Sequence, residues 1–262
     1  MTDQQAAAGT AEGQGPVEIT PEVAERLEAE REDLFEKFEI PEGFPEAVRE
    51  EAEEITTDVQ PAVDAELEDR RDLREMTTWT TDPIDAQDFD DALSIEEREA
   101  EYVLWVHIAD VTHYVRPGTA MWDEALRRGN TVYLPGHTVH MLPPILAETV
   151  CSLVEGEDRL AHTVEMHLDK ETLSFEDIEI YKSVIQSDAR LTYTEAVDRL
   201  EDESADLHDP IQLVWEVADR LHEQRKADGS LVLNPRRDRA HTIIEESMLK
   251  ANKAVTHELM WD

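Results

Sequence analysis

The sequence has very little cysteine and no long apolar run. Cys151 is the only cysteine among 262 residues, which excludes an intrachain disulfide and fits a reducing cytosol. No stretch approaches the about 18 consecutive apolar residues that a membrane-spanning helix needs. Residues 1–16, "MTDQQAAAGTAEGQGP", lack both the basic and the apolar region of a secretory signal. We therefore expect a cytoplasmic protein that makes no membrane contact, with Cys151 as a buried structural thiol.

Positive charge is also scarce. The chain carries 63 acidic and 24 basic residues, a net charge of −39, and only six of the bases are lysine. Such a chain either binds basic partners or is built for a concentrated-salt cytosol, where a carboxylate surface keeps it soluble. The acid is spread along the whole chain, which favours a halophile. At about 1 M salt the Debye length is only about 3 Å, so nucleic acid is not excluded as a partner. No protein partner can be deduced.

The order of the expected elements predicts an α+β fold. Residues 1–16 have no apolar period and are expected to form a disordered tail. Residues 17–75 are expected to be a helical lead-in, broken at "IPEGFP" and followed by a charged linker over 59–75. In the main domain, 76–262, strands come first and helices later. Strands are expected at 91–97, 102–115, 130–136, 160–169 and within 175–193, and helices at 119–130, 192–200, 209–229 and 241–262.

One acidic stretch differs from the rest of the chain. The segment "TTWTTDPIDAQDFDDALSI" contains five aspartates within ten residues, and no glutamate occurs from Met76 to Ile95. A segment selected only for negative charge would not exclude glutamate. The five are Asp82, Asp85, Asp88, Asp90 and Asp91.

These aspartates have the chemistry of a site for a hard cation. Pro83 and the turn-like "PIDAQD" allow the chain to fold back, so that Asp82 approaches the later aspartates. On an extended strand Asp88 and Asp90 would share one face and Asp91 would oppose them. Converging carboxylates repel one another unless a cation lies between them, and oxygen ligands suit Mg²⁺ or Mn²⁺. An EF-hand fits poorly, because the turn glycine and final glutamate are missing. A solvated acidic loop is the alternative.

The same motif resembles the signature of a known enzyme family. "TDPIDAQDFDDALS" is similar to the metal-site motif of the ribonuclease II / ribonuclease R family, which carries the RNB domain. The resemblance continues through "VHIADVTHYVRPGTAMWDEALRRGNTVYLPGHTVHMLPPILAETVCSLVEGEDRLAHTVEM", "DGSLVL" and "IIEESMLKAN". It implies a mixed, largely antiparallel β-sheet flanked by helices and preceded by a short helical segment, with 76–262 as the N-terminal part of the catalytic domain.

The resemblance also implies roles for individual residues. Asp82, Asp88 and Asp91 match the Mg²⁺ ligands, and Asp90 matches the carboxylate whose loss stops cleavage without preventing RNA binding. Tyr133 matches the aromatic residue that stacks on the 3′-terminal base, although without the resemblance an ordinary strand aromatic is the favoured interpretation. The implied reaction is processive, Mg²⁺-dependent 3′→5′ hydrolysis of single-stranded RNA to nucleoside 5′-monophosphates.

Further substrate contacts are expected on one helix and in one basic cluster. The family places the helix that carries Glu245 and Glu246 beside the RNA path, although a solvated helix face would read the same. Arg236 and Arg237 form the best local basic cluster for phosphate contact. His107 is expected in the core rather than as a ligand, since hard cations prefer oxygen.

The sequence departs from the family pattern in two places. Leu233 stands where the family usually has an aromatic residue, and no counterpart of a later arginine-rich segment follows the "IIEESMLKAN" helix. We therefore expect a C-terminally incomplete ribonuclease R-like exoribonuclease. A catalytically inactive RNA-binding or regulatory module of the same type is the alternative.

Overall fold

The fold was examined in a computed structural model of the protein. It describes residues 20–134, 137–230 and 238–261; the expected tail, 1–16, lies outside the described residues. The chain forms two compact units. Unit 1 contains the residues up to Thr56 together with Tyr114–Ala147, and unit 2 contains Thr57–His113 together with Glu148–Asp262.

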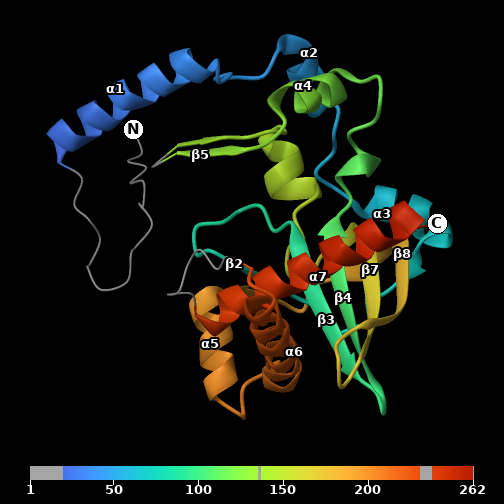
Figure 1. The fold of residues 1–262 in the computed structure, drawn as a ribbon. Helices are drawn as coiled ribbons and strands as arrows, with labels where there is room; N and C mark the ends of the chain where they lie inside the picture. The colour runs from blue at the N-terminus through green and yellow to red at the C-terminus, as the bar shows by residue number, and fades with distance from the viewer. Residues whose placement is uncertain (1–19, 135–136, 231–237, 262) are drawn as a thin grey trace. The chain divides into compact units, whose positions relative to one another are not determined.

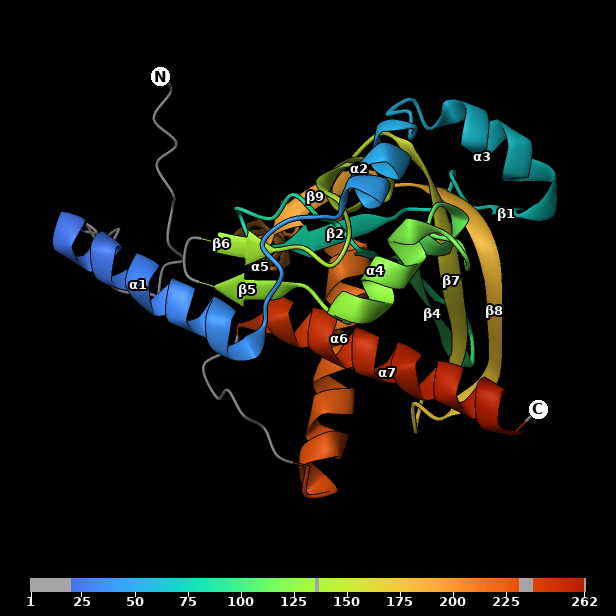
Figure 2. The ribbon, with the colours of Figure 1, turned by 90° about the horizontal axis from the view of Figure 1, so that it is seen from above.

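Unit 1 consists of helices and a two-stranded ribbon. Its elements are α1 (Pro21–Phe38), α2 (Glu46–Glu53), α4 (Ala120–Arg128), β5 (Val132–Leu134) and β6 (His137–Val139). The ribbon is antiparallel (Figure 2). Thr20 caps α1 by accepting from the Val23 amide, and Pro21 opens the helix, where its missing N–H costs no hydrogen bond. Gly129 ends α4 with a positive φ of 73°, a conformation that glycine adopts without strain.

Unit 2 is built on a seven-stranded sheet with the order β1-β8-β7-β4-β3-β2-β9. The four central pairings, from β8 to β2, are antiparallel, and the two edge pairings are parallel. The α+β prediction with a largely antiparallel sheet is therefore confirmed. The strands are β1 (Arg71–Asp72), β2 (Trp79–Asp82), β3 (Asp91–Glu97), β4 (Glu101–Ala109), β7 (Asp158–Asp169), β8 (Phe175–Gln186) and β9 (Ala189–Thr192).

Three helices bury one face of this sheet (Figure 1). They are α5 (Tyr193–Glu201), α6 (His208–Ala227) and α7 (Arg239–Trp261). Alternate strand residues such as Leu93 and Leu104 point into this core, where they meet Ile211 and Val214 of α6; all four are fully buried. Each such side chain contributes roughly 1.5–3 kcal/mol relative to an exposed one. The apolar periods of strands and helices therefore determine this interface.

The shorter elements complete the chain. They are α3 (Gln60–Glu66), two 3-10 helices (Leu67–Asp69 and Val111–His113) and a π-helix (Ile145–Val150). The predicted charged linker, 59–75, is therefore structured. Val63 of α3 is completely buried against Leu160 and Val184, and Arg70 is only 7% exposed. The prediction weighed the charges of this segment more heavily than its few apolar residues, of which Val63 anchors the segment by tertiary packing.

The other face of the sheet carries a continuous row of buried polar side chains. Thr78, Ser94, His107, Thr163 and Ser183 contact one another in sequence at 2.8, 3.1, 2.8 and 2.6 Å. All five are at most 1% exposed. Burial lowers the pKa of His107 to about 3, so the imidazole is neutral. The expectation that His107 belongs to the core is confirmed.

Candidate active site

The predicted turn brings the two ends of the aspartate motif together. Strand β2 ends at Asp82 and β3 begins at Asp91, and the two strands are antiparallel neighbours, with Trp79 opposite Leu93. The connection turns at Pro83, whose carbonyl accepts a hydrogen bond from the Ala86 amide (3.1 Å). Asp88 and Asp90 lie in this connection rather than on a strand, so the expected alternation of faces does not apply to them.

The end of the turn is fixed from two sides. The Phe89 amide donates to the Ser152 hydroxyl (3.0 Å), and the Phe89 carbonyl accepts from the Leu153 amide (2.8 Å). On the other side the Ala109 amide donates to the Asp90 carbonyl (3.0 Å). Backbone bonds of this kind hold the carboxylates in place before any ligand binds, which is what a binding or catalytic site requires.

Asp82 is the most perturbed carboxyl of the group. It is only 9% exposed, and its Oδ2 is buried without a hydrogen-bond partner among the described residues. Burial, reinforced by the charges of Asp91 and Asp88, raises its pKa to about 7, although Thr80 and Arg190 act in the opposite direction. A buried acceptor without a donor is costly, so this oxygen is suited to bind a cation or a proton.

Asp90 and Asp91 are perturbed in the same direction. Burial raises the pKa of Asp91 to about 6. Asp90 is open to solvent on one side, but protein atoms dehydrate its carboxylate on the other, and the charges of Asp88 and Asp91 add to this effect, so that its pKa is also raised to about 6. Three neighbouring carboxyls with raised pKa values are typical of functional sites.

The nearby thiol is inert by comparison. Burial, followed by the negative charges of Asp90 and Asp110, raises the pKa of Cys151 to about 12. A thiol that stays protonated is a poor nucleophile. Cys151 is buried, as predicted.

The donor set fits a hard divalent cation. Four carboxylates with one orphan oxygen supply the ligands that Mg²⁺ prefers, and Mg²⁺ keeps several waters and takes only one or two carboxylates directly. The four aspartates do not, however, form a set of three ligand atoms within 4.8 Å of one another in the part of the chain that the structure describes. A divalent cation held here would therefore need further oxygen ligands, such as water.

A compact group of ligand atoms occurs elsewhere, on the central strands. Glu165, His167 and Glu179 have ligand atoms within 4.8 Å of one another. These carboxylates already have partners: Arg71 forms ion pairs with Glu165 (3.4 Å) and Glu179, and the Tyr181 hydroxyl donates to Glu165 (2.6 Å). A cation could enter this group only by displacing the arginine.

Sequence reasoning missed one basic residue at the site. Arg190 of β9 donates from its Nη2 to the Pro83 carbonyl (2.6 Å), and its guanidinium lies 5.2 Å from the centre of the Phe89 ring. Its Nε is buried without a hydrogen-bond partner among the described residues. The signal was one arginine in "SDARLTY", about a hundred residues after the motif, and only the parallel pairing of β9 with β2 brings it there.

The other predicted residues belong to other segments of the chain. Tyr133 belongs to unit 1 and is 69% exposed. Glu245 and Glu246 of α7 form ion pairs with Arg225 of α6, at 3.3 and 2.6 Å. Arg236, Arg237 and Leu233 lie outside the described residues.

Comparisons with known proteins identify the family. The RNB domain model matches residues 70–261. Ribonuclease R of Aquifex aeolicus is 38% identical over 252 residues, an alignment that covers 86% of this chain and 35% of that protein. The structure of Mycoplasma genitalium RNase R in complex with double-stranded RNA is similar, with a TM-score of 0.78 and 25% identity, over 87% of this chain and 44% of that one.

The chain therefore belongs to the RNB-domain family, and the family prediction is confirmed. It spans about a third of the length of the curated relatives that it matches. The fold is also shared by yeast Ssd1, described as a pseudonuclease, with a TM-score of 0.63 and 20% identity over 73% of this chain and 26% of that one. Fold alone thus does not establish cleavage. None of the described helices has the length and apolar character needed to cross a membrane.

Proposed function

We propose that this chain forms the metal-binding part of a 3′→5′ exoribonuclease that hydrolyses single-stranded RNA to nucleoside 5′-monophosphates. The observation that carries the proposal is the group formed by Asp82, Asp90 and Asp91. Their pKa values are raised to about 7, 6 and 6, and Asp82 has an orphan oxygen. In a member of the RNB family, such a group needs a cation to balance it.

Asp82, Asp88 and Asp91 would hold Mg²⁺, or Mn²⁺ in its place. When bound, a divalent cation activates water and stabilises the charge that develops on phosphate oxygens. Asp90 is the most solvent-exposed of the perturbed carboxyls, and we assign it to the transition state rather than to holding the metal. We also propose that Arg190, whose guanidinium bonds the Pro83 carbonyl at this turn, contributes positive charge beside a substrate phosphate.

Substrate binding would use further residues. Tyr133 is exposed and can stack on a terminal base without regard to its identity. Glu245, Glu246, Arg236 and Arg237 remain proposed RNA contacts. The relative that binds double-stranded RNA supports RNA as the partner, while the preference for single strands and processive cleavage rest on the family resemblance.

The decisive experiment replaces Asp90. Asp90→Asn should lower the rate of RNA cleavage by several orders of magnitude and leave RNA binding nearly unchanged, because the group acts in the transition state. The measurement is degradation of a 5′-labelled single-stranded RNA by the gene's full product, with and without Mg²⁺. Asp85→Asn is the matched control, since Asp85 is exposed in the same turn. Equal cleavage by Asp90→Asn and Asp85→Asn would refute the assignment.

The same assay tests the alternative of an inactive RNA-binding module, which the pseudonuclease with this fold makes worth distinguishing. RNA binding by the wild-type protein without Mg²⁺-dependent shortening of the RNA would favour that module.

We also propose that the protein works in the cytoplasm of a halophile. With 63 acidic residues, transfer from molar KCl to about 10 mM salt should remove helical structure, because the Debye length grows to about 30 Å and the carboxylates repel one another. Circular dichroism measures this change. A spectrum that stays native-like in low salt would contradict the halophile assignment.

A further inference from the structure

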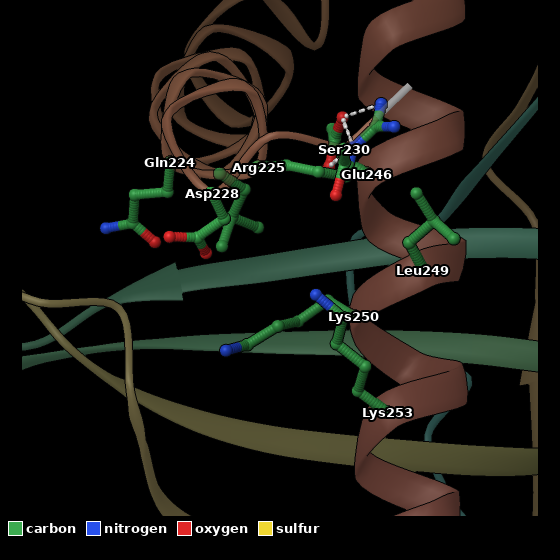
Figure 3. A pocket seen from close by; sticks show the side chains of 9 residues that line it. Gln224, Arg225, Asp228, Ser230, Glu246, Leu249, Lys250 and Lys253 are labelled. Carbon is green, nitrogen blue, oxygen red and sulfur yellow. Dashed lines mark hydrogen bonds and ion pairs between the residues drawn. The ribbon is translucent and has the colours of Figure 1, made fainter. Parts of the chain in front are cut away.

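A second site candidate lies between α6 and α7, away from the aspartates. The two helices enclose a pocket of about 120 Å³, and a single water needs roughly 10–15 Å³ on this measure. Figure 3 shows Lys250 and Lys253 of α7 reaching toward the space below Gln224 of α6 and Asp228, the residue that follows α6. The pocket therefore has room for a small polar ligand.

Lysine is rare in this protein, and two of its six lysines line this one pocket. Lys250 and Lys253 are three residues apart on a helix, so both project from the same face. Like charges at this spacing repel each other and destabilise a helix. In a chain with a net charge of −39, a pair of neighbouring ammonium groups is an exception that calls for an anion.

Lys250 is held in an unusual position. It is 9% exposed, its Nζ donates to the Leu173 carbonyl (2.6 Å), and it lies 3.8 Å from the centre of the Phe175 ring. An ammonium group has three protons, and this bond uses one of them. Burial, and then the charge of Lys253, lowers the pKa of Lys250 to about 8. An anion in the pocket would supply the missing acceptors.

The lysine charges are not balanced within the pocket. Glu246 lines it, but its carboxylate is bound to Arg225 (2.6 Å) and His222 (2.8 Å). Asp228 lines the pocket as well, and in the part of the chain that the structure describes it forms no ion pair with either lysine. The two ammonium groups therefore exceed the remaining carboxylate by one positive charge.

The pocket is remote from the aspartates within the same unit. Leu173, which fixes Lys250, lies in the turn that joins β7 to β8. The register places Asp91 at one end of β3 and Glu97 at the end nearest this turn. Six steps of about 3.4 Å separate them, on the order of 20 Å. A ligand held here would not touch the proposed metal ligands.

We infer that the pocket between α6 and α7 binds a phosphate group, held by Lys250 and Lys253, either on a free phosphate monoester or on an RNA backbone. Phosphate oxygens accept charge-assisted hydrogen bonds from ammonium groups and restore the local balance of charge. The inference goes beyond the proposed nuclease reaction and does not depend on the metal ligands, although the pocket shares Glu246 with the proposed RNA contacts.

The test is an isothermal calorimetric titration of the protein with inorganic phosphate at constant ionic strength. The wild-type protein should show saturable binding in the millimolar range. Lys253→Gln should weaken it about tenfold, the factor expected for one lost charge-assisted bond. Lys253 is exposed, so the variant should fold. Lys226→Gln is the matched control: Lys226 lies on α6, pairs with Glu223 and does not line the pocket.

Asp228→Asn should change the phosphate affinity in the opposite direction. Removing the opposing carboxylate should tighten phosphate binding several-fold. Absence of saturable binding by the wild-type protein would overturn the inference, and so would equal affinities of Lys253→Gln and Lys226→Gln.

The source of the phosphate is decided by repeating the titrations with AMP and with a short single-stranded RNA. Weakening of RNA binding by Lys253→Gln identifies an RNA contact; weakening of AMP and phosphate alone identifies a monoester site. Asp90→Asn should bind phosphate like the wild type, so a failure of the nuclease proposal would remain distinguishable from a failure here.

Discussion

Two buried carboxyl groups at the same end of the sheet, Asp110 and Asp82, have pKa values shifted in opposite directions. Asp110 follows β4, and its side chain is completely buried. Burial alone would raise its pKa, but hydrogen bonds from His162, Thr112 and Arg70 outweigh that effect and hold the pKa well below its usual range. Asp82 is almost as buried, yet its pKa is raised to about 7. Burial therefore does not decide the charge of a carboxyl group; its partners do.

The difference separates a structural role from a functional one. Asp110 accepts from the Arg70 guanidinium at 2.6 Å and from the Thr112 hydroxyl at 2.6 Å, so its charge is fully compensated by the protein. Asp82 has an oxygen with no partner among the described residues. The first carboxylate locks the segment around Arg70 onto the sheet, whereas the second is left for a ligand that carries positive charge.

The largest expected effect on stability comes from breaking the compensated group. Asp110→Asn should lower the free energy of unfolding at pH 7 by about 3–5 kcal/mol, because it removes the fully buried counter-ion of Arg70 and leaves the guanidinium with the part-exposed Glu66 (3.0 Å) alone. Urea unfolding measures the loss. The matched control is Asp72→Asn, which breaks an ion pair with Arg74 whose carboxylate is 46% exposed and should cost at most about 1 kcal/mol.

The pH dependence adds a second check of Asp110. Its pKa is lowered in the folded protein, so its contribution to stability is present above the unfolded value of 3.8 and disappears as the pH falls further into the acid range. Equal losses for Asp110→Asn and Asp72→Asn would mean that the buried pair is not a structural lock.

The uncompensated group should respond in the opposite direction. The pKa of Asp82 is about 7 in the folded protein against an ordinary value of 3.8, so the folded state binds more protons between these values and stability falls as pH rises through them. In EDTA at pH 8, Asp82→Asn should therefore be more stable than the wild type by roughly 2–4 kcal/mol. Below about pH 4 the two should be equal.

Adding Mg²⁺ should distinguish the wild-type protein from Asp82→Asn further. At pH 8 it should stabilise the wild-type protein by about 2.7 kcal/mol at a hundred times its dissociation constant, and it should stabilise Asp82→Asn far less. Thermal unfolding with and without Mg²⁺ gives both numbers. A less stable Asp82→Asn in EDTA would show that Asp82 is already compensated, which would remove the contrast with Asp110.

Replacing Tyr133 should have the smallest effect, and it serves as an uncharged control for the two carboxyl variants. Because it is 69% exposed, Tyr133→Ala should leave the unfolding free energy and the Mg²⁺ response unchanged. It should weaken the hold on the RNA 3′ end by about 1–3 kcal/mol, the value of one stacked base, and lengthen the limit product on a gel. A product ladder identical to that of the wild type would make Tyr133 an ordinary surface aromatic.

Local structure followed closely from the order of the residues. The strand predicted at 91–97 is β3, Asp91–Glu97, and the helix predicted at 119–130 is α4, Ala120–Arg128. The alternation of apolar residues in strands, their helical period and the capping residues each involve only a few neighbouring positions. Strands and helices can therefore be predicted from them without knowledge of the fold. The segment 59–75 could not be read in this way, because its anchor, Val63, is a single residue whose partners lie about a hundred positions away.

The sequence by itself determined that five aspartates gather in one turn, that oxygen ligands dominate there, and which family the chain belongs to. Only the tertiary structure decided which carboxylates are compensated. Asp110 receives Arg70 and His162 from distant segments, and Asp82 receives Arg190 but also the repulsion of Asp91. It likewise brought Lys250 and Lys253 to a pocket closed by α6. The physical reason is that a pKa depends on charges and water within a few ångströms, and the chain order does not fix those distances.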